Sequence, residues 1–190
     1  MKELLEKINK IILLSEATIV SMESYLKKET IKKHTHLLVE GKVCNRLWFI
    51  EKGFARTYHL DDGVDKTTWF LRENDFVISV YSFFSQKPSY EYIEAMEDCS
   101  LIYISYDSLQ EMYKKHSEFN VVGRIITEQY YVLSEQRSVL LRTTTVEERF
   151  YNLLRLYPDI LIKIPAKYVA SYIGCQPETL SRIRKLNKYE

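Results

Sequence analysis

The side chains best suited to chemistry stand near the C-terminal end, at outward positions of a predicted final helix. They are Gln176, Glu178, Thr179, Ser181 and Arg182. A carboxylate can accept a hydrogen bond from cytosine N4, and a guanidinium can donate two to guanine O6 and N7. Glu178 and Arg182 can therefore read a C·G step in a DNA major groove. The alternative is a surface ion pair, because the two residues lie one helical turn apart.

Two short helices are predicted around these residues. Pro165 begins the helix AKYVASYI and Pro177 begins the helix ETLSRIRKLNK, since proline is well tolerated in a first helical turn. Gly174 between them supplies the positive φ that a sharp turn needs, and Ala170 leaves room for the second helix. Four apolar positions are spaced to close a shared core: Val169, Ile173, Leu180 and Ile183. The pattern predicts a helix-turn-helix motif, and the alternative is an ordinary helical hairpin.

The distribution of charge favours a nucleic-acid partner for this segment. The whole chain has 27 basic and 26 acidic side chains, a net charge of +1, so only local segregation of charge can recruit a polyanion. From residue 163 onward the basic residues are Lys163, Lys167, Arg182, Arg184, Lys185 and Lys188, against Glu178 and Glu190. Because a basic cluster neutralises phosphates, we include Lys167 and Lys185 among the predicted DNA-binding residues.

A second chemical possibility is a metal site at His34, His36 and Glu40. Their H-x-H-x3-E spacing resembles the metal motif of cupin oxygenases, and alternate strand positions point to one side of a sheet. The context of that motif is otherwise missing, and Lys32 and Lys33 disfavour a divalent cation. We interpret the two histidines as exposed strand residues and expect neither a metal nor a cofactor. A cupin-like metal enzyme is the alternative.

Other functional motifs are missing from the sequence. No Ser-His-Asp or Cys-His arrangement, Walker loop or G-x-G-x-x-G loop occurs, so we expect no enzyme. Cys44, Cys99 and Cys175 lie more than fifty residues apart and form no metal or redox pair, which favours a reducing compartment. The N-terminus lacks the continuous apolar region of a signal peptide, and no stretch approaches the roughly 18 apolar residues of a membrane span. We therefore expect a cytoplasmic protein with no membrane partner.

The remaining elements must position these residues, and 190 residues suffice for one domain or two small ones. An apolar content of 46% and a charged content of 28% exclude a disordered or collagen-like chain. Helical spacing of Leu4, Leu5 and Ile8 predicts a first helix. Ser15 can cap a second helix that runs to about Lys28.

Short β-branched and aromatic runs predict the strands of an all-β sandwich or barrel between about residues 30 and 105. Turn signals recur about every 10–12 residues. They are Glu40-Gly41, Lys52-Gly53, Asp61-Asp62-Gly63 and Glu73-Asn74-Asp75. Most of the aromatic residues, which include 15 Tyr, are interpreted as core.

Helical patterns return after these strands. Ser105 or Asp107 can cap a helix that ends near His116, and a long helix follows over 119–142. Along this helix, six residues recur at alternating steps of four and three, which is the spacing of a heptad seam. The seam residues are Val122, Ile126, Gln129, Leu133, Gln136 and Leu140. We interpret them as a dimer interface whose two glutamines fix the register; the alternative is a helix packed on its own β domain.

The C-terminal part begins at a break over 143–145, where three threonines favour a cap over a helix interior. Thr145 and Glu148 form a capping box for a helix from Val146 to about Tyr157. A short apolar strand, ILIKI, is predicted next. The predicted domains are therefore 1–118 for the β part, 119–142 for the dimerisation helix and 143–190 for the helix-turn-helix.

This order of elements resembles the catabolite-activator/FNR-like (Crp/Fnr) family of bacterial transcription regulators. Markers in the β part are VEG at 39–41, FIEKG at 49–53, DDG at 61–63 and NDF at 74–76. The most specific stretch is YVASYIGCQPETLSRIRKL, in which Glu178 and Arg182 match positions that similar members use for base contacts. Pro177 departs from the pattern, because some members carry another base-reading Arg there.

The resemblance implies an α+β fold: an N-terminal β-roll of the cyclic-nucleotide-binding type, which is a double-stranded β-helix, with flanking helices, then a long dimerisation helix and a C-terminal helix-turn-helix domain. It implies a homodimeric regulator that binds a near-palindromic operator in double-stranded DNA. The resemblance also allows for two further partners, RNA polymerase and an unidentified small-molecule effector. The rival interpretation is a ligand-sensing roll whose C-terminal helices recruit a protein.

The sequence departs from the family in its sensor pocket. Members that bind cyclic AMP carry a Gly-Glu pair for the ribose and, about ten residues later, an Arg-Ser or Arg-Thr pair for the phosphate, where this chain has Ile78-Ser79 and Ser89-Tyr90. Burying a phosphate without a cation costs several kcal/mol, so we expect no response to cyclic AMP. The predicted effector pocket comprises Ile78, Ser79, Tyr81, Ser89 and Tyr90. Its apolar interior is completed by Val77, Val80, Phe83 and Phe84. This interior is either filled by these side chains or open to an apolar effector.

Overall fold

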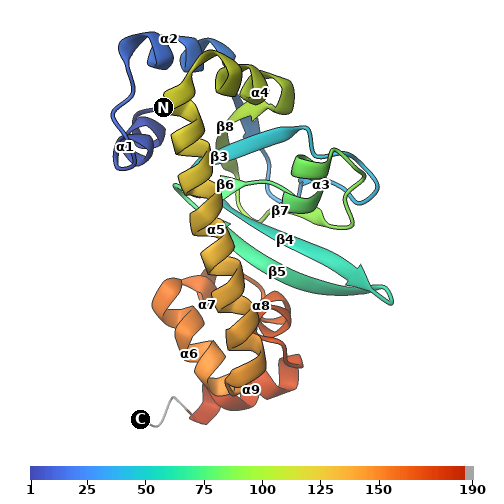
Figure 1. Ribbon diagram of the computed structural model, residues 1–190. Coiled ribbons are helices and arrows are strands. Elements are labelled where there is room, and N and C mark those ends of the chain that lie inside the picture. The colour runs from blue at the N-terminus through green and yellow to red at the C-terminus, as the bar shows by residue number, and fades with distance from the viewer. Residues whose placement is uncertain (187–190) are drawn as a thin grey trace. The chain divides into compact units, whose positions relative to one another are not determined.

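The computed structural model describes residues 1–186, and its fold is mixed α+β, as the sequence predicts. The chain forms two compact units (Figure 1). Unit 1 comprises Met1–Thr57 and Phe70–Tyr130. Unit 2 comprises residues 58–69 together with the part of the chain that follows Tyr130.

Two four-stranded sheets form the β-roll. The first has the order β1-β8-β3-β6, with β1 (Lys27–Ile31), β8 (Cys99–Ser105), β3 (Arg46–Lys52) and β6 (Phe76–Val77). The second has the order β2-β7-β4-β5, with β2 (His36–Leu38), β7 (Tyr92–Ala95), β4 (Phe54–Asp61) and β5 (Val64–Arg72). Strand β3 is central in its sheet, because Trp48 pairs with Tyr103 on one side and Val77 on the other. The predicted β architecture is confirmed.

The aromatic residues of the roll supply much of its core, as predicted. Trp48, Phe49, Phe54, Phe70 and Phe83 are at most 3% exposed. Burying a side chain of this size contributes about 1.5–3 kcal/mol relative to leaving it in water. The roll interior is therefore the main source of stability in unit 1.

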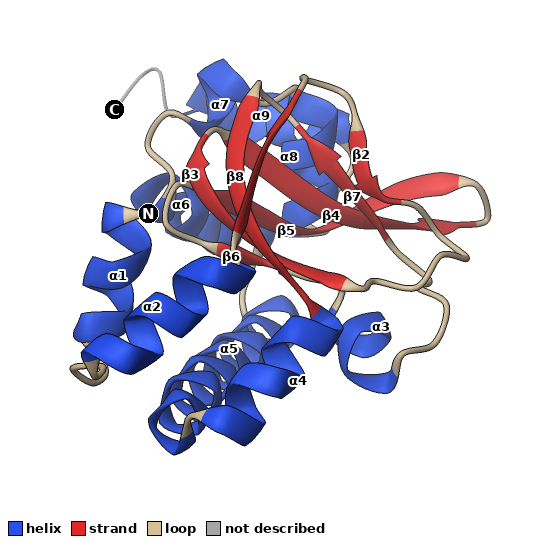
Figure 2. Cartoon of the chain, turned by 90° about the horizontal axis from the view of Figure 1, so that it is seen from above, coloured by secondary structure: helices blue, strands red, loops and turns tan. Residues whose placement is uncertain are grey.

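Helices cover one side of the strands in unit 1 (Figure 2). They are α1 (Lys2–Asn9), α2 (Glu16–Tyr25), α3 (Val80–Ser85), α4 (Tyr106–Lys115) and the first half of α5 (Ser117–Thr143). The Ser15 side chain accepts a hydrogen bond from the Thr18 N–H and so caps α2, and Ser105 caps α4 in the same way through Ser108. The predicted run of α2 to Lys28 is wrong, because β1 begins at Lys27 and pairs there with Tyr103 of β8.

Gly53 occupies the tight turn between β3 and β4 with φ +109°. A Cβ atom at this position would lie 2.7 Å from Cys99 Sγ and 2.8 Å from the Asp98 carbonyl oxygen. Gly63, in the β4–β5 turn, also has a positive φ of +76°, but a Cβ atom added there would have no neighbour within 4 Å. Backbone conformation alone therefore requires glycine at 63, whereas conformation and space both require it at 53.

Gly53→Ala is expected to lower the free energy of unfolding by about 3 kcal/mol, since the strained φ and the clash with backbone add together. Gly63→Ala, the control, is expected to cost about 1 kcal/mol, because only the strained φ applies. Urea unfolding followed by circular dichroism measures both. Equal losses for the two variants would contradict the close approach at Gly53.

The C-terminal helices belong to unit 2. They are α6 (Val146–Leu156), α7 (Ile160–Lys163), α8 (Ala166–Ile173) and α9 (Pro177–Leu186). The predicted capping box is present, because Thr145 and Glu148 each bind the other's backbone N–H. The predicted strand ILIKI is wrong: this segment is helix α7, in which Ile160 and Ile164 are buried one turn apart and Asp159 pairs with Lys163 at 3.1 Å.

Candidate nucleic-acid interface and roll interior

Helices α8 and α9 are joined by a sharp turn in unit 2. Gly174 has φ +74°, in the left-handed region that favours glycine, and its N–H donates to carbonyls of the last turn of α8. The Cys175 N–H donates to the Ala170 carbonyl at 3.0 Å, which closes the turn. The next residue, Gln176, accepts hydrogen bonds from the N–H groups of Thr179 and Leu180 through its carbonyl oxygen and so starts α9. The two short helices and the glycine turn between them thus lie where the sequence predicts them.

The apolar residues predicted to hold the two helices together are buried. Val169, Ile173, Leu180 and Ile183 are 0%, 1%, 0% and 7% exposed. Ala170 is also fully buried, as the close passage of the second helix requires. The shared core is therefore confirmed, and it leaves the polar faces of both helices toward solvent.

The structure leaves the predicted DNA-binding residues accessible. Exposed ones are Lys167, Gln176, Glu178, Ser181, Arg182 and Lys185, whereas Thr179 is half-buried. Neither Glu178 nor Arg182 is held in an ion pair within the described part of the chain. Lys188 and Glu190 of the predicted basic tail lie outside the described residues. Helix α9 itself carries Arg182, Arg184 and Lys185 against Glu178, so its surface is basic.

Arg149 fixes the start of α6 to the ends of two other helices. Its Nε donates to the Ile173 carbonyl at the end of α8 at 2.7 Å, and Nη1 donates to the carbonyls of Thr144 and Leu141 at the end of α5. The last carbonyls of a helix lack partners within it, and a cation there is favourable. Arg149 thus orients α8. Sequence reasoning missed this residue, because its partners are backbone atoms remote in the sequence.

Arg137 makes a second long-range contact to α8. Its guanidinium lies 3.7 Å from the centre of the Tyr172 ring, and Nη2 donates to the Tyr172 carbonyl at 2.8 Å. It also lies 5.7 Å from the ring of Trp69. Burial lowers the pKa of Arg137, opposed by the neighbouring Tyr172. The guanidinium therefore stacks between aromatic rings, which is a geometry that lysine cannot reproduce.

The hydroxyl of Ser171 ties residues of the β4–β5 hairpin to α8 within unit 2. Ser171 Oγ accepts from the Thr67 N–H at 2.8 Å and donates to the Asp65 carbonyl at 3.1 Å. One hydroxyl thus satisfies a backbone donor and a backbone acceptor. Sequence reasoning missed this residue as well, because a serine in a helix interior gives no local signal for such a contact.

The predicted seam on α5 divides into buried and exposed positions. Val122 is 2% exposed and belongs to the core of unit 1, so the prediction that it contacts a partner is corrected. Ile126 and Leu140 are half-buried, whereas Gln129, Leu133 and Gln136 are exposed. Two apolar residues that were not predicted are also exposed beside the glutamines, Val132 at 52% and Val139 at 55%.

In the predicted effector pocket, Ser79 and Ser89 are buried and lie against each other. Ser79 and Ser89, which replace the carboxylate and the guanidinium of nucleotide-binding members, are 0% and 3% exposed, and their hydroxyls lie 3.1 Å apart. The Glu91 carboxylate hydrogen-bonds to Ser79, and burial raises the pKa of this carboxyl group. A carboxylate is a poor neighbour for a phosphate. Ser79 and Ser89 therefore hydrogen-bond to each other and to Glu91.

The aromatic residues expected around the serines mostly face outward instead. Tyr81, Phe84 and Tyr90 are 45%, 52% and 57% exposed, and Val80 is 54% exposed. The rings of Tyr81 and Tyr90 pack on each other, with centroids 5.3 Å apart. Helix α3 is only six residues long and turns one face inward, which buries Ser82 and Phe83 but leaves Val80, Tyr81 and Phe84 exposed. The prediction of a Tyr-rich interior is wrong for these four residues, although Val77 is buried and Ile78 half-buried.

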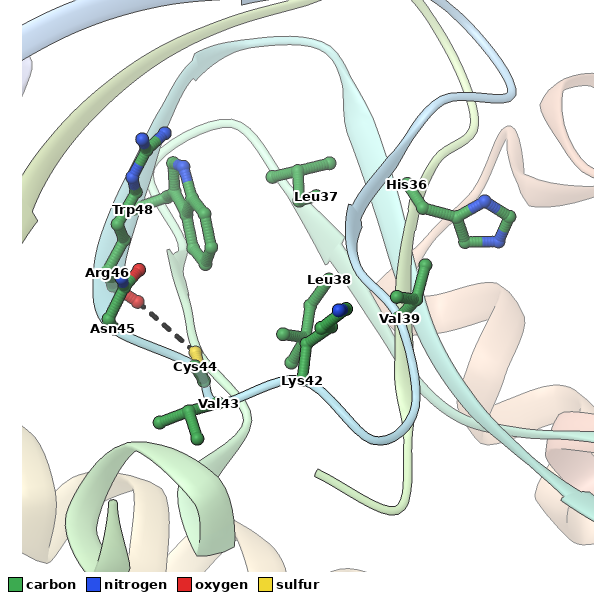
Figure 3. Close-up of a pocket in the computed structure, with 10 residues that line it drawn as sticks. All are labelled: His36, Leu37, Leu38, Val39, Lys42, Val43, Cys44, Asn45, Arg46 and Trp48. Carbon is green, nitrogen blue, oxygen red and sulfur yellow. Dashed lines mark hydrogen bonds between the residues drawn. The ribbon is translucent and has the colours of Figure 1, made fainter. Parts of the chain in front are cut away.

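A cavity of about 320 Å³ opens between β2, the loop after it and the start of β3 (Figure 3). Its apolar lining includes Leu38, Cys44 and Trp48, each at most 6% exposed. Lys42 and Arg46 are basic members of the lining. None of the predicted pocket residues lines this cavity, so sequence reasoning placed the opening of the roll elsewhere.

His34 and His36 make different ring contacts. His34 precedes β2 with φ +66°, and its Nδ1 lies 3.2 Å from Glu94 Oε1, whereas the His36 ring packs edge-on against Tyr92. Within residues 1–186, no group of three His, Cys, Asp or Glu side chains could hold a metal ion. Among the same residues, no helix is both long and apolar enough to cross a membrane.

Comparison with known proteins agrees with this geometry. Residues 28–116 match the family model of the cyclic nucleotide-binding domain. No curated protein matches the sequence.

Solved structures share the fold over most of the chain. FixK2 from Bradyrhizobium japonicum is 20% identical with a TM-score of 0.72 and covers 85% of this chain and 83% of its own. A putative regulator of the Crp/Fnr family from Eubacterium rectale is 19% identical with a TM-score of 0.71, covering 93% and 84%. The c-di-GMP responsive regulator CLP from Xanthomonas campestris is 16% identical with a TM-score of 0.68, covering 92% of each chain. At these identities the likeness shows the fold alone.

Proposed function

We propose that the protein is a homodimeric, sequence-specific DNA-binding transcription regulator of the Crp/Fnr type that acts in the cytoplasm and without catalysis. The observation that carries the proposal is helix α9, which is fastened to α8 by a buried apolar core and presents an exposed basic face. The first half of a recognition helix enters the major groove. Glu178 lies in that half and Arg182 follows one helical turn later, so both can reach base edges.

Selection and sequencing of genomic DNA fragments that the purified protein retains tests this proposal. We expect an inverted repeat whose half-sites lie about one DNA turn, roughly 34 Å, apart. Weak retention of all fragments with a steep salt dependence would instead mean generic phosphate binding. That outcome would favour the rival function, in which the C-terminal helices recruit a protein.

The dimer is proposed to form along one face of α5. Ile125, Val132 and Val139 are spaced seven residues apart, and so are Gln129 and Gln136. In chain order, these five residues are separated by alternating steps of four and three, which is the spacing of a heptad seam. Parallel pairing with a second copy would place valine against valine and glutamine against glutamine. The exposure of Val132 and Val139 supports this face as the partner side.

Val139→Glu is expected to raise the dissociation constant of the dimer at least about 100-fold, because the seam would bury two facing carboxylates at a cost of several kcal/mol. Analytical ultracentrifugation over a concentration series measures the change. Ser134→Glu, on an exposed position roughly opposite on the helix, is the control and should leave the dimer intact. A dimer that tolerates Val139→Glu as well as Ser134→Glu would place the interface on another surface.

We propose that the protein does not respond to cyclic AMP, because of the side chains around Ser79 and Ser89. Ser79 and Ser89 bond to each other, and the nearby Glu91 carboxylate disfavours a phosphate. Isothermal titration of the protein with cyclic AMP should therefore show no saturable heat. Affinity for the selected DNA should be the same with and without the nucleotide.

A further inference from the structure

We propose that the cavity between β2 and β3 binds a small organic anion with an apolar body, and that Lys42 recognises its charge. This site is separate from the segment around Ser79 and Ser89. The proposal concerns unit 1 alone, so it holds whether or not the protein binds DNA.

The size and lining of the cavity fit a small organic molecule. Its volume of about 320 Å³ lies at the lower end of the range for ligand sites, which is about 300–1,000 Å³. Figure 3 shows the Trp48 ring and the side chains of Leu37 and Leu38 facing the same space. Leu38, Cys44 and Trp48 are held by the roll core, with exposures of 6%, 0% and 3%. These three buried side chains give the site a preformed apolar floor, and His36, Lys42, Asn45 and Arg46 make the rest of the lining polar.

The charged lining residues are all basic. Lys42 and Arg46 line the cavity together with the imidazole of His36, and none of the ten lining residues is acidic. The carboxylate of Glu40 in the adjoining loop is hydrogen-bonded to Tyr92 and is not part of the lining. Burial and, to a smaller extent, the Glu91 carboxylate raise the pKa of the Cys44 thiol, but Glu91 is not part of the lining. The two basic side chains therefore make an anionic group the charge that the cavity complements.

Lys42 is the cation that remains available for a ligand. Arg46 already pairs with Glu29 at 3.3 Å and stacks on the Tyr103 ring at 4.4 Å. Lys42 is exposed, and its ammonium group has no carboxylate partner among residues 1–186. A ligand whose apolar part lies over Leu38 and Trp48 can place a carboxylate at this ammonium group.

The ligand class differs from a cyclic nucleotide. The cavity offers the ammonium group of Lys42 and a largely apolar floor, which suit a carboxylate on an aromatic or aliphatic body better than a polar sugar phosphate. The occupant is therefore expected to be a monoanion of low polarity.

Backbone hydrogen bonds connect the wall of the cavity to the α3 segment. The Gly41 N–H donates to the Ser89 carbonyl at 2.7 Å, and the Ser89 N–H donates to the Lys42 carbonyl at 2.9 Å. The Cys44 N–H donates to Ser82 Oγ at 2.8 Å. A ligand that displaces this loop would therefore displace the segment from Ser82 to Ser89 as well.

Fluorescence of Trp48 can report binding directly. The chain has two tryptophans, so Trp69→Phe leaves Trp48 as the single tryptophan of the full-length protein, and excitation at its red edge avoids the tyrosines. The probes are 4-phenylbutyrate and its neutral isostere 4-phenylbutyramide. We expect a saturable change with one site per chain, and about five- to tenfold tighter binding of the acid, as a partly screened ion pair provides.

Two matched variants in this background identify the role of Lys42. Lys42→Ala should bring the affinity for the acid down to that for the amide and leave the amide unchanged. Lys52→Ala removes the same charge from an exposed position outside the cavity and should change neither. Val43→Phe, which fills the cavity, should weaken both probes.

Three results would overturn the proposal: no saturable change at millimolar probe, equal affinities for acid and amide in the parent protein, or equal effects of Lys42→Ala and Lys52→Ala. Near-ultraviolet circular dichroism of each variant checks that the roll is intact. Because no DNA is present, failure here leaves the proposed regulator function standing, and failure of the DNA selection leaves this site standing.

Discussion

Replacing Arg182 by alanine is expected to weaken binding to the selected operator by about 2–6 kcal/mol, which is roughly 30- to 20,000-fold. The range follows from the loss of one bidentate base contact in each protomer, each worth about 1–3 kcal/mol of discrimination. Arg182 is exposed and outside the α8–α9 core, so its removal should not disturb the fold. Fluorescence anisotropy with operator and scrambled duplexes measures the effect.

Arg184→Ala is the matched control for this prediction. Arg184 lies on the same helix and carries the same charge, but it is two residues further on and so faces away from Arg182. The Arg184→Ala variant should lose only the salt-dependent part of the binding free energy. This loss should be equal on operator and scrambled DNA. If both variants lost the same amount on the operator, α9 would not be reading bases, and the proposed sequence-specific function would be wrong.

Glu94→Gln is expected to lower the free energy of unfolding by about 1.5–3 kcal/mol, because it removes the charge of a carboxylate that accepts two hydrogen bonds from the buried Arg56. Arg56 is 1% exposed, and its Nε and Nη2 donate to Glu94 Oε2 at 2.9 and 2.7 Å. Urea unfolding of the two proteins gives the difference. Glu111→Gln is the control, since its ion pair with Lys115 is solvent-exposed and should contribute little. Similar losses for the two variants would show that the Arg56–Glu94 pair is not worth more than a surface pair.

The same pair makes stability depend on pH. Burial alone would raise the pKa of Glu94, but the hydrogen bonds and charge of Arg56 outweigh it and hold the pKa below the ordinary value of 4.5. Because the folded pKa is depressed, this contribution is present above pH 4.5 and is lost as the pH falls through the folded pKa. The unfolding free energy of the parent protein should therefore fall more steeply than that of Glu94→Gln below about pH 4.5. Parallel curves would show that Glu94 does not cause acid destabilisation.

Local signals predicted the elements that carry the proposed function. Gly174 indicates a left-handed turn because a residue with a Cβ is strained there, and Thr145 with Glu148 indicates a helix start because their side chains satisfy free backbone N–H groups. The spacing of Val169, Ile173, Leu180 and Ile183 indicates two helices packed on each other. Each signal lies within a few residues of its effect, so the chain sequence was enough.

Errors arose where neighbouring elements compete for the same residues. The segment ILIKI has the composition of a strand, but within residues 1–186 no other strand is placed to pair with it, and a single helical turn buries Ile160 and Ile164 together. Lys27 and Lys28 continue a helical pattern, yet the open edge of β8 pairs with them instead. Propensity is a weak prior, and tertiary pairing overrides it.

The sequence by itself determined the helix starts at Ser15, Ser105 and Thr145, the two C-terminal helices with the turn between them, and their exposed polar residues, because these follow from caps, turns and periodicity along the chain. Only the tertiary structure decided which face of α5 is free, where the roll opens, and that Arg56, Arg137 and Arg149 are held by partners far away in the sequence. The physical reason is that burial and long-range hydrogen bonds depend on which surfaces meet in three dimensions. The apolar positions along a helix look alike in the sequence until a neighbouring element covers some of them: Val122 is buried in unit 1, whereas Val132 in unit 2 is exposed.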